Sequence, residues 1–267
     1  MKIDLHVHSN NSDGTMTVLE LIEEAKEKKI DCFALTDHDT VQGIEEYQKL
    51  DTDYQMIYGI ELSTYLNGKS VHILGYFPNP LPKIDELRSY LAEIKEKREK
   101  RVQKILTGLK KYFDIEIDYE EVKKNSHGVI ARPHIARVIS EKYGYTYEEI
   151  FEKFLSDDSP AYVEISRLST KDGIALLKRN HAITVLAHPL FLTDEMVNEI
   201  ISYGVDGIEV YYSDQNRKKY HKLAEKNHLL ETGGSDYHGA ILDSEFGTSS
   251  VPEESFNLLK EQLDKIV

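Results

Sequence analysis

Apolar and polar residues alternate at the amino terminus with the two-residue period of a β-strand. Within residues 3–8, Ile, Leu and Val alternate with Asp4, His6 and His8. Residues two apart on a strand project to the same face, so His6 and His8 emerge together. Asp13 follows in a turn rich in Ser and Asn. The stretch predicts either a divalent metal site or a pair of solvated histidines on an edge strand.

Strand and helix patterns then alternate along two parts of the chain. This rhythm is typical of a parallel sheet or barrel, and with the first strand it gives seven strand candidates in an α/β fold. Further strands are expected at 32–36, 57–61, 71–76, 183–187, 207–211 and 229–232, and helices at 17–29, 41–50, 170–179, 194–203, 215–227 and 253–266.

Helical spacing replaces this alternation in the middle of the chain. Residues 83–112 predict one long charged helix with an apolar stripe. Shorter helical patterns begin at Pro133 and near 147–155. The predicted domains are therefore a barrel formed by residues 1–80 and 166–267 and a helical insertion formed by residues 81–165.

Composition narrows the class of protein. The 267 residues are 40% hydrophobic and 30% charged, as is ordinary for a globular protein. We expect a cytoplasmic location, because the chain shows no secretory signal and no apolar run of the roughly 18 residues that span a bilayer. The net charge of −14 argues against binding long duplex nucleic acid. Cys32 is the only cysteine, which excludes a disulfide framework and a thiolate metal cluster, and it is expected to be buried.

Histidines and carboxylates recur at or near the expected carboxyl ends of strands, where α/β barrels carry their chemistry. Each histidine alone could be a hydrogen-bonded core or rim residue, but together the set exceeds what one ion binds. We expect two or three divalent ions, preferably Mn²⁺, with Fe or Zn²⁺ as alternatives. The candidate ligands are His6, His8, Asp13, His38, Glu61, His72, His188, Asp236 and His238, and Asp37, Asp39 and Glu209 are expected to support them.

Clustered divalent ions activate water and stabilise both oxygens of an in-line displacement. Hydrolysis of a phosphate ester by a metal-bridging hydroxide is the natural reaction, because the sequence offers no Ser or Cys nucleophile paired with a base. The residues expected to take part in catalysis are Asp13, His38, Glu61, Asp236 and His238.

The motifs are similar to those of the PHP (polymerase and histidinol phosphatase) family. They are residues 6–14 (HVHSNNSDG), 36–39 (TDHD), 59–61 (GIE), 71–73 (VHI), 187–189 (AHP) and 234–238 (GSDYH). The resemblance implies a distorted seven-stranded (β/α)7 TIM-like barrel and a trinuclear centre. It would assign His6, His8, Glu61 and Asp236 to one ion, Asp13, His38 and His238 to a second, and Glu61, His72 and His188 to the third.

Basic residues in the central segment suggest where a substrate could bind. The apolar stripe of the long helix passes through Arg98, which should face inward near Arg101 and bind either a phosphate or an internal carboxylate. The resemblance extends to a bacterial subgroup of nucleoside 3′,5′-bisphosphate phosphatases and 5′–3′ exoribonucleases. That subgroup has an Arg-x-x-Arg pair and an Arg-x-His element here, which correspond to Arg98, Arg101, Arg132 and His134.

These observations predict a phosphoesterase that removes the 3′-phosphate of a nucleoside 3′,5′-bisphosphate such as pAp. The alternatives are 5′–3′ trimming of short RNA, hydrolysis of histidinol phosphate, and a non-enzymatic binding module with a degenerate PHP site. The expected partner is a small phosphorylated nucleotide or a short RNA, with no membrane and no long duplex. The sequence predicts no oligomeric state.

Overall fold

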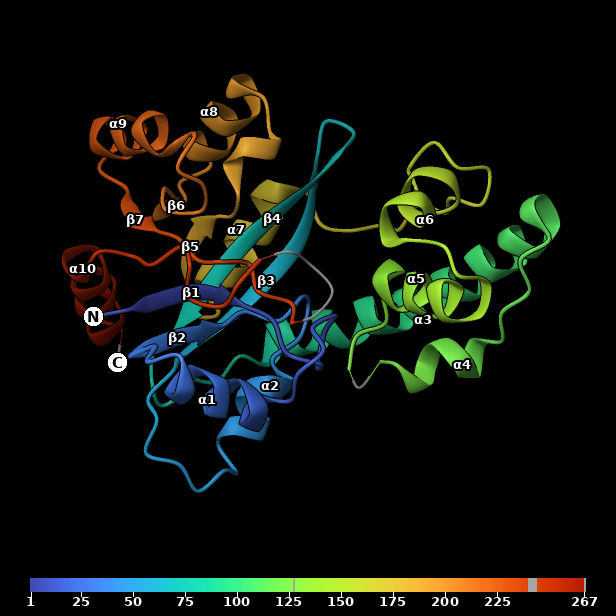
Figure 1. The fold of residues 1–267 in the computed structure, drawn as a ribbon. Helices are drawn as coiled ribbons and strands as arrows, with labels where there is room; N and C mark the ends of the chain where they lie inside the picture. The colour runs from blue at the N-terminus through green and yellow to red at the C-terminus, as the bar shows by residue number, and fades with distance from the viewer. Residues whose placement is uncertain (127, 240–243, 267) are drawn as a thin grey trace.

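A seven-stranded sheet forms the centre of the protein, and its strands lie side by side in chain order (Figure 1). The computed structural model describes every residue except 127, 240–243 and 267. The strands are β1 (Ile3–Val7), β2 (Cys32–Leu35), β3 (Ile57–Leu66), β4 (Lys69–Phe77), β5 (Ile183–Leu186), β6 (Gly207–Glu209) and β7 (Leu230–Thr232). The seven strands match the number predicted from the alternating patterns.

One strand runs against the parallel arrangement that the strand–helix rhythm suggested. β4 pairs in antiparallel fashion with both β3 and β5, whereas the other neighbours are parallel. Asn67 and Gly68 connect β3 to β4 and both have positive φ, 48° and 87°. Asn-Gly at such angles is typical of a tight hairpin turn. The hairpin leaves no room for a crossover helix, so β4 must reverse.

The sheet curls into a half-barrel. The two edges of the sheet approach each other, because β1 contacts the segment that follows β7. The backbone N–H of Leu5 donates to the carbonyl of Gly233 at 3.0 Å, and Val7 forms a β-bridge with Tyr237. The carboxyl ends of β1 and β7 are thereby brought together, although their residues are more than two hundred positions apart in the sequence.

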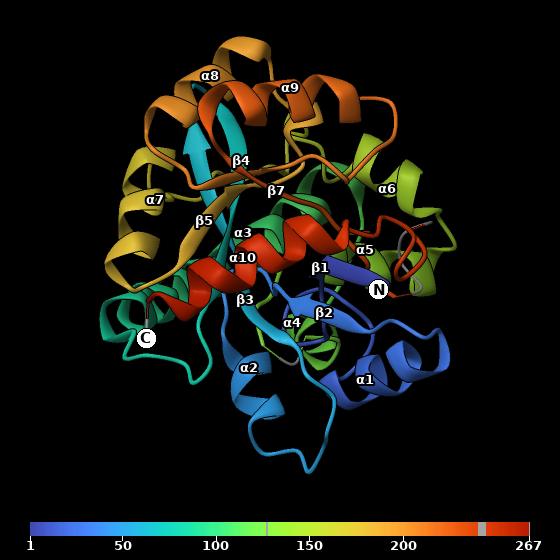
Figure 2. The ribbon, with the colours of Figure 1, turned by 90° about the vertical axis from the view of Figure 1, so that its left-hand side faces the viewer.

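Helices cover the outer face of the sheet and one of its ends. Their apolar side chains pack on outward-facing residues of the strands. They are α1 (Val18–Glu27), α2 (Gln42–Tyr47), α7 (Thr170–Arg179), α8 (Asp194–Ser202) and α9 (Arg217–Asn227). α10 (Glu253–Asp264) crosses the end of the sheet near both termini, as Figure 2 shows. Its Phe256, Leu259 and Leu263 pack against inward-facing residues of β1, β2, β4 and β5.

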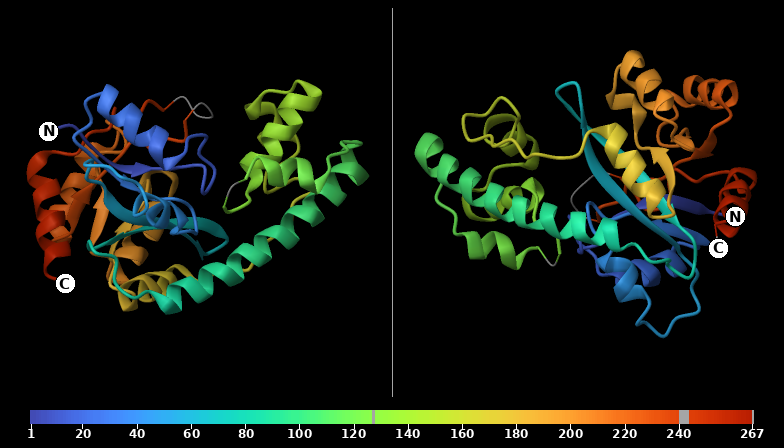
Figure 3. Two further views of the ribbon diagram at one scale, coloured as in Figure 1. Left: turned by 90° about the horizontal axis from the view of Figure 1, so that it is seen from below. Right: turned by 180° about the vertical axis from the view of Figure 1, so that it is seen from behind.

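The remaining helices extend to one side of the half-barrel (Figure 3). They are α3 (Asp85–Phe113), α4 (Tyr119–Lys124), α5 (Arg132–Tyr143) and α6 (Tyr147–Lys153). Leu87 and Leu91 of α3 pack with the half-barrel, whereas Val102 and Leu109 join a separate apolar cluster with α4, α5 and α6. Because α3 belongs to both clusters, the division at residues 81–165 stays a prediction. The long helix agrees with the sequence pattern, and α4 is an additional short helix.

The structure also bears on Cys32 and on membrane-spanning helices. Cys32 is buried, and burial raises the pKa of its thiol to about 12, so it behaves as a small apolar side chain. Among the described residues, no helix combines the length and the apolar character needed to cross a bilayer.

Candidate metal centre

The nine predicted ligands converge on one end of the half-barrel. His6 lies on β1 and His8 directly follows it, whereas Glu61 and His72 lie within β3 and β4. The other ligands lie in loops: Asp13 after β1, His38 after β2, His188 after β5, and Asp236 and His238 after β7. The prediction that β3 ends at Glu61 was wrong, since the hairpin with β4 continues the strand to Leu66.

One group of ligand atoms surrounds a carboxylate oxygen of Glu61. Nε2 of His6 and Nε2 of His8 lie 3.2 and 3.1 Å from Oε2 of Glu61. The same two nitrogens lie 3.4 and 3.2 Å from Oδ1 of Asp236. Two imidazoles and two carboxylates therefore point at a common centre and could hold one ion.

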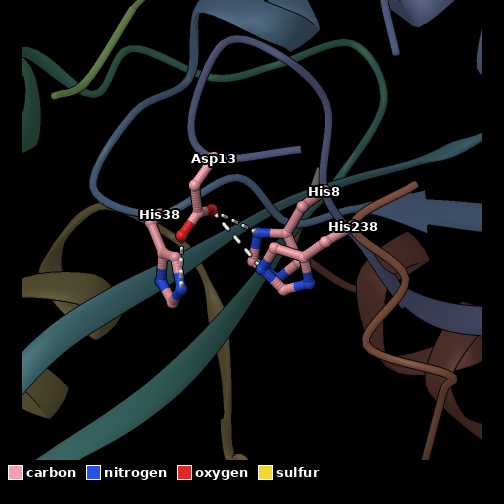
Figure 4. A group of neighbouring side chains, drawn as sticks. All are labelled: His8, Asp13, His38 and His238. Carbon is pink, nitrogen blue, oxygen red and sulfur yellow. Dashed lines mark ion pairs between the residues drawn. The ribbon is translucent and has the colours of Figure 1, made fainter. Parts of the chain in front are cut away.

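A second group, drawn in Figure 4, gathers around Asp13. Oδ1 of Asp13 lies 3.4 Å from Nε2 of His238 and 3.9 Å from Nδ1 of His8. Its other oxygen lies 3.9 Å from Nε2 of His38. These are the three residues that the resemblance assigned to the second ion, with His8 in addition.

A third group forms on the other oxygen of Glu61. Oε1 of Glu61 lies 2.9 Å from Nδ1 of His72 and 2.9 Å from Nε2 of His188. The two histidine nitrogens are themselves 3.2 Å apart. His38 also reaches this region, because its Nδ1 lies 3.1 Å from Oε2 of Glu61. Glu61 thus stands between the three groups, as a bridging ligand would.

Unpaired polar atoms in this cluster test whether a metal fits. Six buried donor or acceptor atoms at the centre have no hydrogen-bond partner among the described residues, and such atoms are costly to leave unpaired. They are Nε2 of His6, Nε2 of His8, Oδ1 of Asp13, Nδ1 of His38, Oε2 of Glu61 and Oδ1 of Asp236. All are nitrogen or oxygen atoms that ligate divalent first-row ions, so the residues fit a multinuclear metal centre.

The electrostatics of the cluster are those of a site built for cations. Burial alone would lower the pKa of His8, but the nearby carboxylates of Asp236 and Glu61 raise it to about 10. His38 differs, because burial outweighs its neighbouring carboxylates and lowers its pKa to about 4. The pKa of Glu61 is well below its usual range, because the nearby histidines outweigh the effect of burial. Such strong coupling is typical of functional sites.

Three buried carboxylates lie behind the ligands and hold their backbone in place. Glu209 accepts from the backbone N–H of His188 at 2.6 Å and lies 3.1 Å from Nδ1 of His6. Asp37 accepts from the hydroxyls of two serines in the loop that carries Asp13. Asp4, which the sequence analysis did not single out, accepts from the backbone and hydroxyl of Ser235.

Arg98 and Arg101 of α3 are both buried, as the apolar stripe predicted for Arg98. Arg98 donates to Asp39 and, at 3.2 Å, to the hydroxyl of Ser63 on β3, so the internal carboxylate partner considered from the sequence is present. Nε of Arg98 has no hydrogen-bond partner in the part of the chain that the structure describes. Arg101 donates to the carbonyl of Val163 and lies 5.6 Å from the ring of Tyr162.

Arg132 and His134 open helix α5 on the same side of the molecule. Arg132 donates to the carbonyl of Leu155 at 2.8 Å, and its guanidinium lies 5.9 Å from the Tyr162 ring. Burial lowers the pKa of His134, although the negative charge of Asp13 acts in the opposite direction. The first turn of α5 therefore lies near the Asp13 loop.

Arg167 is a fourth arginine in this region that sequence reasoning missed. It donates to the hydroxyl of Ser70 at 2.8 Å, and that hydroxyl lies 3.3 Å from Nε2 of His72. Its Nε is buried and has no hydrogen-bond partner within the described ranges. Burial and the nearby charge of Arg98 lower the pKa of Arg167. No periodic pattern marks this loop position.

Curated relatives cover most of the chain. A 5′–3′ exoribonuclease of Haemophilus influenzae is 30% identical over 89% of this chain and 90% of its own. A phosphoribosyl 1,2-cyclic phosphate 1,2-diphosphodiesterase of Eggerthella lenta is 29% identical, over 88% of this chain and 94% of its own. A 3′,5′-nucleoside bisphosphate phosphatase of Chromobacterium violaceum is 27% identical, over 88% of this chain and 87% of its own.

A solved structure agrees with these relatives. It is described as a putative metal-dependent phosphoesterase from Bifidobacterium adolescentis, and it superposes with a TM-score of 0.88 at 27% identity. The superposition covers 97% of this chain and 96% of the other. The PHP domain profile matches residues 4–241. The chain therefore belongs to the PHP domain family of metal-dependent phosphoesterases, as its motifs predicted.

Proposed function

We propose that this hydrolase removes the 3′-phosphate of nucleoside 3′,5′-bisphosphates such as pAp. The observation that carries the proposal is the position of an arginine cluster beside the metal centre. Arg98 and Arg167 contact residues adjacent to the ligands His38 and His72, and each has a buried Nε that no described residue pairs with. A substrate with two phosphates would satisfy both groups of residues.

The nine ligands would form three ion-binding groups within the centre. His6, His8, Glu61 and Asp236 would hold one ion, Asp13, His38 and His238 a second, and Glu61, His72 and His188 a third. Bound divalent ions would supply an activated water and neutralise the phosphate oxygens, as in other multinuclear sites. Asp13, His38, Glu61, Asp236 and His238 surround the place where the scissile phosphate would sit.

The second phosphate would bind Arg98, Arg101, Arg132 and His134, with Arg167 completing the cluster. Arginine presents a planar fork that matches phosphate oxygens bidentately. Because only Asp39 and the exposed Asp157 form ion pairs with these arginines in the described part of the chain, the cluster carries excess positive charge in a chain of net charge −14. That local excess favours a dianionic group.

Replacing Arg98 by Ala tests the assignment. We expect turnover of pAp to fall far more than hydrolysis of a simple aryl phosphate, because the aryl ester has no second phosphate to lose. Arg88→Ala is the matched control, since Arg88 lies on the same helix and pairs with Glu45 at the surface. Equal losses on both substrates would contradict the proposed role of Arg98.

A second candidate is 5′–3′ exoribonuclease activity on short RNA, which the name of the Haemophilus relative favours. The two reactions have the same requirements, a 5′-phosphate at the arginines and a phosphorus atom attached to a 3′-oxygen at the metals. Comparing pAp with a 5′-phosphorylated oligonucleotide separates them. Histidinol phosphate and a cyclic phosphate ester complete the panel, and Mn²⁺ is the first ion to supply.

A degenerate, non-catalytic centre is the remaining alternative. The complete ligand set argues against it. Purified protein with fewer than two bound ions, and without phosphatase activity after Mn²⁺ is added, would support that alternative.

A further inference from the structure

Two aromatic side chains stand at the rim of the metal centre, on the side of β5 and β6. Phe191 ends the short 3₁₀ helix η1 (Pro189–Phe191), and Tyr212 lies in the loop that follows β6. Their ring centroids are 6.2 Å apart with an interplanar angle of 77°. Both rings pack near the proposed ligand His188, at 5.5 Å for Phe191 and 5.8 Å for Tyr212.

Phe191 is poorly placed for a purely structural role. It is 62% exposed, the largest value among the exposed large hydrophobic side chains in the described part of the chain. A backbone hydrogen bond from its N–H to the carbonyl of His188 at 3.3 Å helps hold the turn. Tyr212 is fixed from below, because its hydroxyl donates to Asp236 at 3.3 Å. The two rings form an aromatic corner, here called the aromatic ledge, in which Phe191 is largely exposed and Tyr212 is half-buried.

The ledge and the arginine cluster lie on different sides of the metal centre. The arginines contact Asp39 after β2, Ser63 on β3 and Ser70 on β4. The ledge follows β5 and β6, which come next in the order of strands. Nδ1 of His72 and Nε2 of His188 meet at 3.2 Å between them. A substrate held at the arginines and at the metals would therefore continue toward the ledge.

We propose that Phe191 and Tyr212 form a base-stacking subsite for the nucleotide on the 3′ side of the scissile phosphate. Its ligand class is a 5′-phosphorylated oligonucleotide, and the proposal rests on the second form of the proposed function, 5′–3′ cleavage of short RNA at the same metal centre. Aromatic side chains stack on any nucleobase, so the subsite favours an extended chain without reading its sequence. A bisphosphate such as pAp has no nucleotide at this position and leaves the ledge empty.

The reaction that places a base there is the same hydrolysis. Water adds its hydroxyl to phosphorus, the bond between phosphorus and the 3′-oxygen breaks, and the 3′-oxygen takes up a proton. The first nucleotide leaves with its 5′-phosphate. The remainder keeps the attacked phosphate as a new 5′-phosphate, which suits it for binding at the arginines in a next round.

Phe191→Ala tests the subsite through the ratio of the kcat/KM values for two substrates. We expect kcat/KM for the 5′-phosphorylated dinucleotide pApA, relative to that for pAp, to fall about tenfold, because one base loses its stacking partner. Phe191→Trp should retain the wild-type ratio, since a larger ring still stacks. Tyr112→Ala is the control, because Tyr112 is 49% exposed near the far end of α3. An unchanged ratio in Phe191→Ala would overturn the proposal.

A binding measurement separates this proposal from the proposed function. A 5′-phosphorylated dinucleotide with 2-aminopurine as its second base, and with a methylene group in place of the scissile 3′-oxygen, is added to the metal-loaded protein, where no turnover occurs. The chain has no Trp that would contribute background fluorescence. Stacking on the ledge should quench the 2-aminopurine, and Phe191→Ala should abolish the quenching. Hydrolysis of pAp without quenching by wild-type protein would overturn the ledge alone, whereas quenching without any hydrolysis would overturn only the proposed function.

Discussion

The orientation of His6 depends on one buried carboxylate. An imidazole can bind a metal through Nε2 only if its proton is on Nδ1. Oε1 of Glu209 lies 3.1 Å from Nδ1 of His6. Because an ionised carboxylate can only accept a hydrogen bond, this contact favours the form of His6 that carries a proton on Nδ1. The other oxygen of Glu209 holds the backbone of His188. A single side chain thus positions two proposed ligands, one on β1 and one in the loop after β5.

Replacing Glu209 by Gln should weaken metal binding while preserving shape. The amide can turn its oxygen to the His188 N–H, but its NH₂ then faces Nδ1 of His6 and favours the tautomer that cannot ligate through Nε2. We expect the affinity for Mn²⁺ to fall about 10- to 100-fold. Titration calorimetry on the metal-free protein measures this directly.

Glu231→Gln provides the control for that substitution. Glu231 faces Nδ1 of His221 at 2.7 Å, so the same chemical pair is changed on α9 and β7, outside the nine ligands. Its Mn²⁺ affinity should match the wild type. If Glu209→Gln also binds Mn²⁺ like the wild type, the positioning role of Glu209 is wrong.

At the scale of elements, α10 closes the end of the half-barrel opposite the metal centre. Leu259 is fully buried and packs inside the curled sheet, whereas its neighbour Leu258 is 46% exposed. Leu259→Ala should lower the free energy of unfolding by about 2–5 kcal/mol, because it removes apolar contacts and leaves a cavity. Leu258→Ala should change it by no more than about 0.5 kcal/mol. Urea denaturation of both variants compares the two values, and similar losses would contradict this packing.

Elements with a strong local pattern were predicted well from the sequence. The α7 helix begins at Thr170 after the cap Ser169, and the long α3 helix ends within a residue or two of its expected limits. β4 was harder, because its direction is decided by the Asn67–Gly68 turn and not by the apolar pattern of the strand. Periodicity gives the type of an element, whereas the turn that precedes it gives its direction.

Some residues of the candidate site could likewise be predicted from the sequence, and others could not. Histidines near strand ends could be grouped in advance, because parallel strands bring their carboxyl ends to one rim. Arg167 and Asp4 could not, since their importance comes from partners far away in sequence: Ser70 for Arg167, and Ser235 for Asp4. Asp4 did leave a trace, because the two-residue period of the strand places it on the same face as His6 and His8.

At the scale of the whole molecule, protonation of the centre couples stability to pH. In the metal-free protein, the pKa of His8 is raised from 6.5 to about 10. A raised pKa contributes stability that is complete below the unfolded value of about 6.5 and is lost as the pH approaches 10. A metal ion must displace this proton, so metal affinity rises with pH over the same interval. His38, with a pKa lowered to about 4, is already neutral and needs no such displacement.

With rising pH the metal-free protein loses stability and the affinity for metal increases. Together these two effects predict how metal removal changes thermal stability. Mn²⁺ at about 100 times its dissociation constant should stabilise the fold by about 2.7 kcal/mol, which raises Tm by about 5–10 °C for a chain of this size. The difference in Tm between Mn²⁺-loaded and EDTA-treated protein should widen from pH 6.5 to pH 9, because the metal-free form loses the contribution of protonated His8 while the loaded form binds more tightly. Glu61→Gln, which changes the carboxylate shared by the three groups, should nearly abolish the difference. Calorimetric scans across this range measure it, and a difference that stays constant or narrows would mean that protons do not compete with the metal at His8.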